Sequence, residues 1–134
     1  MNRREYQPKE FDLSTFLLLH DRLATSVLLF MLAVGIWGLA SYVRGGVLTG
    51  SLSGALLIGQ ALVVVQVLAG VALYLNGSRP RSSTHILYGV TAIVVLPFIW
   101  SYAKDKHPRH GLLFYSLVAL FIVGLSIRGM ATGS

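Results

Sequence analysis

The sequence contains no cysteine among its 134 residues. This absence excludes disulfide bonds, thiolate zinc sites, iron–sulfur clusters and covalently attached c-type haem. Charge is also scarce, because Asp, Glu, Lys and Arg make up only 12% of the chain. A typical soluble domain carries about twice that share. The composition therefore argues against a water-soluble fold.

Apolar residues are abundant, at 54% of the chain, and the mean hydropathy is +0.69. The hydrocarbon core of a bilayer takes about 20 helical residues to cross, and its dryness requires backbone groups to bond within the helix. Four apolar runs predict four transmembrane helices, at residues 13–43, 52–75, 83–103 and 111–127. Their short connections predict an all-α, antiparallel, up-down-up-down four-helix bundle.

Around this membrane domain, residues 13–129, we expect a polar N-terminal tail at 1–12 and a flexible C-terminal end at 130–134. The chain has no room for a second, soluble domain. The net charge of +6 comes from basic residues scattered among the loops. That distribution is typical of span ends and does not indicate a nucleic-acid partner. We expect an integral protein of a bacterial plasma membrane, and the charge balance leaves its orientation open.

Two histidines open helices that run in the same direction. His20 lies near the start of the first helix, and His85 near the start of the third. Both imidazoles are therefore expected at one membrane face and at similar depth. Neutral imidazole is a common metal ligand, and two of them can ligate haem iron from opposite sides. Alternatively, each histidine simply lies at the lipid headgroups.

Other candidate cofactor-binding residues share that face. Small residues would leave room for a flat ring, although they also serve ordinary helix packing. Arginines could pair with haem propionates, although lipid headgroups are equally suitable partners. Gln66, inside the second span, could approach the edge of the ring. The small residues are Ala24, Gly70, Gly89 and Gly124, and the arginines are Arg22, Arg79, Arg81 and Arg128.

Three short stretches resemble one four-helix half of the haem A synthase family. They are Leu19-His20-Asp21-Arg22, Gln66-Val-Leu-Ala-Gly70 and Thr84-His85-Ile-Leu-Tyr88. The resemblance covers roughly residues 14–129 and implies that His20 and His85 are axial ligands of a b-type haem. Tyr88 joins the candidate cofactor-binding residues through the same motif.

The chain also departs from the family pattern. The arginine after the first histidine is displaced by one position, and Leu17 stands where the catalytic half has a glutamate. We expect the second four-helix half to be missing as well. The resemblance therefore implies a non-catalytic, haem-b-binding half.

Together these features predict a membrane cytochrome b-like protein that acts in electron transfer or haem handling. Without a constellation of catalytic acids or nucleophiles, no catalytic activity is expected of the chain alone. A quinone, redox proteins, a second copy or a larger redox complex are its expected partners besides the lipid bilayer. The alternatives are a cofactor-free structural subunit and a quinone-binding membrane protein.

Overall fold

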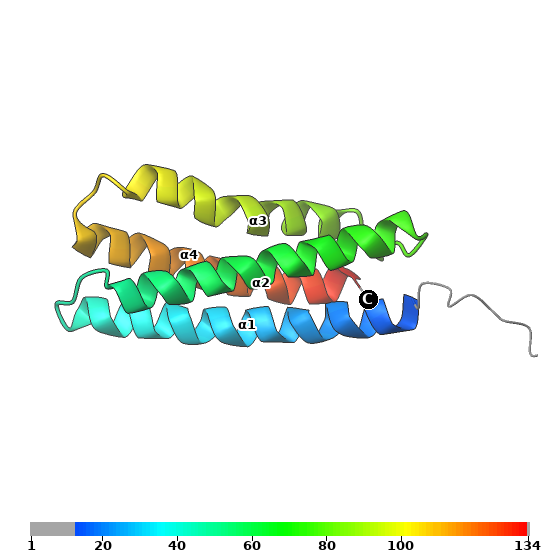
Figure 1. Cartoon of the computed structure of the whole chain (residues 1–134), viewed down its shortest axis with the longest axis horizontal. Coiled ribbons are helices and arrows are strands. Elements are labelled where there is room, and N and C mark those ends of the chain that lie inside the picture. The colour runs from blue at the N-terminus through cyan, green and yellow to red at the C-terminus, as the bar shows by residue number, and fades with distance from the viewer. Residues whose placement is uncertain (1–12, 134) are drawn as a thin grey trace, which may run out of the picture.

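The computed structural model describes residues 13–133, which form four helices without a strand in that range. The predicted all-α, antiparallel four-helix bundle is confirmed (Figure 1). The expected polar tail at 1–12 lies outside the described residues. The helices are α1 (Leu13–Val43), α2 (Gly50–Leu75), α3 (Thr84–Ala103) and α4 (Pro108–Gly133).

The fourth helix is longer than predicted at both ends. It begins at Pro108, since a proline in the first helical turn gives up no internal hydrogen bond. It ends at Gly133, so residues 130–133 belong to its last turn, and the flexibility expected of this end stays a prediction. The backbone N–H of Ser82 donates to the Thr132 carbonyl over 3.1 Å. This bond ties the last turn of α4 to the connection between α2 and α3.

Glycines allow α1 and α4 to pack closely. A Cβ added at Gly35 would lie 2.6 Å from the Leu120 side chain, and one added at Gly38 would collide with Ser116. Small residues permit this approach because they remove side chains from between two backbones. The buried core is formed mainly by α1, α2 and α4 and includes Val27, Met31, Leu56, Val63, Leu112, Ala119 and Ile122.

The third helix is the most peripheral of the four. Its buried residues are Leu96 and Ala103, both in its second half, whereas eight residues of α4 are buried. The first half of α3, which carries His85, therefore has few apolar ties to the rest of the bundle.

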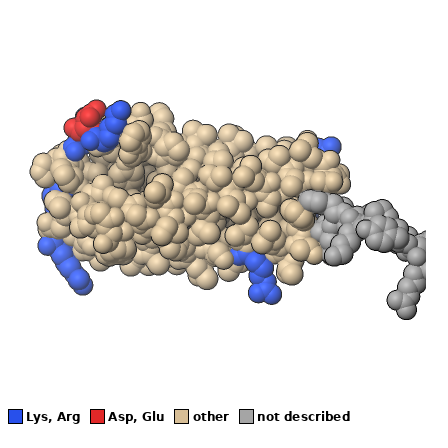
Figure 2. Space-filling model, viewed as in Figure 1, with Lys and Arg blue, Asp and Glu red and all other residues tan. Residues whose placement is uncertain are grey.

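The surface of the bundle suits a bilayer. All four helices are long and apolar enough to cross a membrane. Large apolar side chains are exposed along them, for example Leu57, Leu87 and Phe98. On the face that Figure 2 shows, most charged residues lie near the ends of the bundle, and one basic side chain protrudes from the lower edge between the middle and the right end. Because so much exposed apolar surface is unfavourable in water, this is an integral membrane protein whose outer faces contact lipid.

Candidate functional site

The structure brings His20 and His85 together at one end of the bundle. Their ring centroids are 6.0 Å apart and the ring planes make an angle of 73°. Both side chains are half-buried. They come from α1 and α3, which are at diagonal corners and each pack mainly against α2 and α4. The two imidazoles thus meet between diagonal helices that otherwise pack against the same two neighbours, α2 and α4.

The hydrogen bond of His85 defines which nitrogen carries its proton. Its Nδ1 lies 2.9 Å from the backbone carbonyl oxygen of Gly129 on α4. A carbonyl oxygen can only accept, so Nδ1 donates and Nε2 keeps its lone pair. Metal-ligating histidines have this arrangement, with the second ring nitrogen donating to a carbonyl or carboxylate. In this tautomer, the lone pair of His85 Nε2 is available to a ligand.

The surroundings of His20 contain two polar atoms without partners. Its Nδ1 is buried and makes no hydrogen bond, and the same is true of Oε1 of Gln66 on α2. Gln66 lies one helical turn before Gly70, whose backbone is close to the His20 ring. Buried polar atoms are normally hydrogen-bonded. These two atoms are therefore candidates for contact with a bound group.

Each ring is backed by glycine on a neighbouring helix. A Cβ added at Gly70 on α2 would lie 3.1 Å from Cε1 of His20. On α4, the residues against His85 are Gly129 and Gly133. Sequence reasoning missed these two because it ended the fourth helix at Ile127. The spacing of four residues between them, which places both on one helix face, is the signal that could have found them.

The remaining small and aromatic candidates differ in how far they are exposed. Ala24, Tyr88 and Gly89 are half-buried, and an added Cβ at Gly89 would meet open space. Gly124 is exposed and also faces open space. On α4 the glycines that lie against the His85 ring are Gly129 and Gly133, and a cofactor role for Gly124 stays a prediction.

The four candidate arginines are all exposed, and the helix bounds place them toward the same end of the bundle as the histidines. The Arg79 guanidinium lies 3.8 Å from the centre of the Tyr74 ring, in a cation–π contact at the end of α2. Arg22, Arg81 and Arg128 lie on α1, on the connection before α3 and on α4, respectively. They surround the histidine end with positive charge.

The number of ligands limits which metal group this pair can hold. Among residues 13–133, no cluster contains three or more His, Cys, Asp or Glu side chains. Zinc sites use three or four protein ligands, so two imidazoles are too few for such an ion. A porphyrin supplies four nitrogens of its own, and two axial imidazoles then complete six-coordinate iron. The pair therefore suits a metal that arrives inside a macrocycle.

A second histidine pair at the opposite end has similar spacing but different surroundings. The rings of His107 and His110 are 6.1 Å apart, and both side chains are exposed. The Nδ1 of His107 accepts from the backbone N–H of Arg109 over 3.1 Å and caps α4. Because both histidines belong to one turn of chain, they cannot reach opposite faces of a planar ring.

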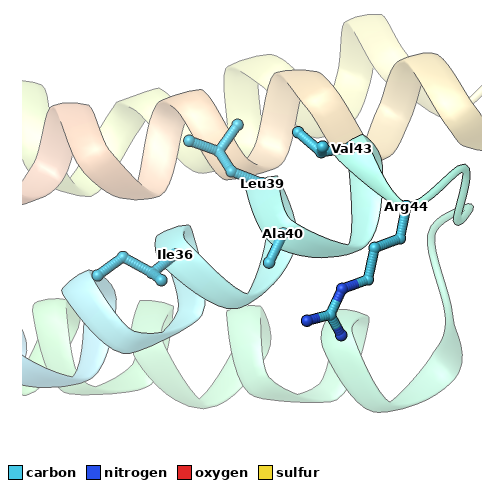
Figure 3. Close-up of a pocket in the computed structure, with 5 residues that line it drawn as sticks. All are labelled: Ile36, Leu39, Ala40, Val43 and Arg44. Carbon is cyan, nitrogen blue, oxygen red and sulfur yellow. The ribbon is translucent and has the colours of Figure 1, made fainter.

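The surface hollows are separate from the histidine pair. One is lined by residues from the last turns of α1 and by Arg44 just beyond them, as Figure 3 shows. Another is lined by one face of α3, from Val90 to Phe98. Each draws its lining from a single helix or its end and is a shallow apolar groove suited to lipid chains.

Comparisons with protein-family models, with curated proteins and with solved structures found no match for this chain.

Proposed function

We propose that this protein binds one haem b between α1 and α3, with His20 and His85 as axial ligands, and acts in electron transfer or haem handling. The observation that carries the proposal is the pairing of the two imidazoles with 6.0 Å between their centroids. Metal–nitrogen bonds of about 2 Å on both sides of one ion would place two ring centres about 6 Å apart. Edge-to-face aromatic pairs can have the same spacing. The hydrogen bonding of the ring nitrogens therefore provides further support for the haem proposal.

The residues around the pair fit such a group. The bond from His85 Nδ1 to Gly129 leaves Nε2 free for iron. The Nδ1 of His20 makes no hydrogen bond, so the ring is not held to a protein acceptor through this nitrogen. Glycine rather than a larger side chain backs each ring, at Gly70 and Gly133. Haem, when bound, supplies one-electron redox chemistry.

The role of the chain would be to hold and tune that group. The diagonal helices α1 and α3 would supply the ligands, and α2 and α4 would face the edges of the ring. The apolar bundle around the site would limit access of water, a factor that affects the redox potential of a bound metal. The arginines at this end offer fork-shaped donors for propionate carboxylates. Quinones, redox proteins or a larger membrane complex are the partners that we propose.

An absorption spectrum tests the proposal. The full chain is purified in mild detergent from haem-replete cells, and haem iron is measured per chain. We expect a Soret band, with sharp α and β bands after reduction, and one iron per chain. His20→Ala and His85→Ala should each abolish the low-spin spectrum. His110→Ala is the matched control, because it removes a histidine from the other, similarly spaced pair.

Two other outcomes would replace the proposal. A colourless protein that carries extractable quinone would identify a quinone site, in which a protonated His20 Nδ1 could donate to a quinone carbonyl and Gln66 Oε1 could accept from the hydroxyl of the reduced quinol. A colourless protein without quinone would favour a cofactor-free structural subunit. Retention of the haem spectrum in both histidine variants would assign the ligands elsewhere.

A further inference from the structure

The His85 ring lies directly on the backbone of α4, where two glycines share one helix face. A Cβ added at Gly129 would lie 3.9 Å from the Cε1 and Nδ1 atoms of His85, which is ordinary contact. One added at Gly133 would lie 2.7 Å from Cε1 and 2.9 Å from Nδ1. The absence of a side chain therefore matters most at Gly133.

The same two-glycine face provides the hydrogen bond to the ring. His85 Nδ1 donates to the Gly129 carbonyl over 2.9 Å, and the Thr132 hydroxyl lies 3.5 Å from the same nitrogen. The Thr132 hydroxyl is itself directed to backbone, since it donates to the Arg128 carbonyl over 2.8 Å. The Gly129 carbonyl is consequently the principal partner of Nδ1, and a ring displaced by a methyl group at position 133 would lose this geometry.

We propose that Gly133 is a positioning residue for His85. By leaving space beside α4, it lets the ring reach the Gly129 carbonyl, which holds the proton on Nδ1 and keeps the Nε2 lone pair available. This inference rests on the proposed function only for the identity of the metal group. The tautomer and its dependence on Gly133 are properties of the protein without any ligand.

The first test measures the tautomer. The full chain, labelled with nitrogen-15 in its histidines and kept in detergent micelles without haem, is examined by NMR. We expect His85 to show the shifts of a ring protonated at Nδ1. Gly133→Ala should shift His85 toward a mixture of tautomers, and Gly133→Leu should do so more strongly. Gly54→Ala is the control, because an added Cβ at that helical position meets open space.

The second test measures haem binding by titration of the same variants. Loss of an outer partner of a metal-ligating histidine typically weakens binding by about 10-fold to 100-fold. We expect Gly133→Ala to weaken haem affinity by about tenfold or more, with Gly54→Ala close to wild type. Circular dichroism checks that the helical content of each variant is unchanged, as expected for an exposed residue in the last turn of α4.

The two tests separate the failure of this inference from the failure of the proposed function. A wild-type His85 protonated at Nε2 would overturn the positioning role, and so would Gly133 variants with unchanged tautomer and affinity. If haem does not bind but the tautomer shifts as expected in the Gly133 variants, the positioning role stands and the haem proposal fails.

Discussion

Gln60 on α2 donates a hydrogen bond from its Nε2 to the backbone carbonyl of Ile93 on α3, over 3.1 Å. Four residues after Ile93, Pro97 lies inside α3 and has no N–H. In a regular helix that N–H would bond the Ile93 carbonyl, so Gln60 satisfies an acceptor that the proline leaves free. This bond links two helices whose contact is the least extensive between sequence neighbours in the bundle.

Replacing Gln60 by leucine should therefore destabilise the bundle in a way that depends on Pro97. Hydrogen bonds between membrane helices contribute about 0.6 kcal/mol on average and up to about 1.7 kcal/mol. We expect a loss in this range for Gln60→Leu, measured as the free energy of unfolding in a denaturing detergent titration. With Pro97→Ala in the same chain, the restored N–H should reduce the loss. An equal loss in both backgrounds would contradict the explanation.

Substitutions of Gly38 and Ser116, where α1 meets α4, should have non-additive effects on the free energy of unfolding. Gly38 faces Ser116, whose side chain is buried and whose hydroxyl donates to the Leu112 carbonyl. Gly38→Ala should lower the free energy of unfolding by about 1–3 kcal/mol, because overpacking forces the helices apart. Adding Ser116→Gly should recover part of that loss. Additive effects of the two substitutions would show that the side chains do not compete for the same space.

Arg109 should be required for the order of the connection between α1 and α2. Its guanidinium donates to the carbonyls of Tyr42 and Gly46 over 3.0 and 3.1 Å and stacks 4.1 Å from the centre of the Tyr42 ring. Lysine lacks this planar fork. Arg109→Lys should therefore cost about 1–2 kcal/mol and speed amide exchange at residues 44–46. The exposed Lys106→Ala is the control and should change stability by less than about 0.5 kcal/mol.

A charge placed in the middle of α3 should oppose membrane insertion. Val94 is exposed at the centre of this helix, whereas Val47 is exposed in the connection at the end of the bundle. Lysine at the centre of a span raises the apparent insertion free energy by about 2.5–3.5 kcal/mol. We expect Val94→Lys to impair insertion in a glycosylation-mapping assay, and Val47→Lys to insert normally. Equal insertion of the two variants would argue that this face of α3 does not contact lipid.

The contrast between the histidine pair and its glycines shows how far sequence reasoning reaches. His20 and His85 could be placed at one end of the bundle because hydropathy defines the spans and short connections make helices alternate in direction. The roles of Gly129 and Gly133 could not be predicted in this way. These two glycines, with Ala131 and Thr132 between them, form a sequence that is typical of a chain end. In the folded chain that turn is helical and packs against His85 and Ser82.

The sequence by itself therefore determined the number and direction of the helices, the membrane setting, the exclusion of cysteine chemistry and the end at which two imidazoles gather. The tertiary structure decided which atoms meet: His85 with the Gly129 carbonyl, Gln60 with the Ile93 carbonyl, and Gly38 with Ser116. The physical reason is that hydropathy specifies which residues lie within the membrane and does not separate those that face lipid from those that face another helix. Close contacts depend instead on the rotation and depth of each helix against its neighbours, which small residues and single hydrogen bonds determine.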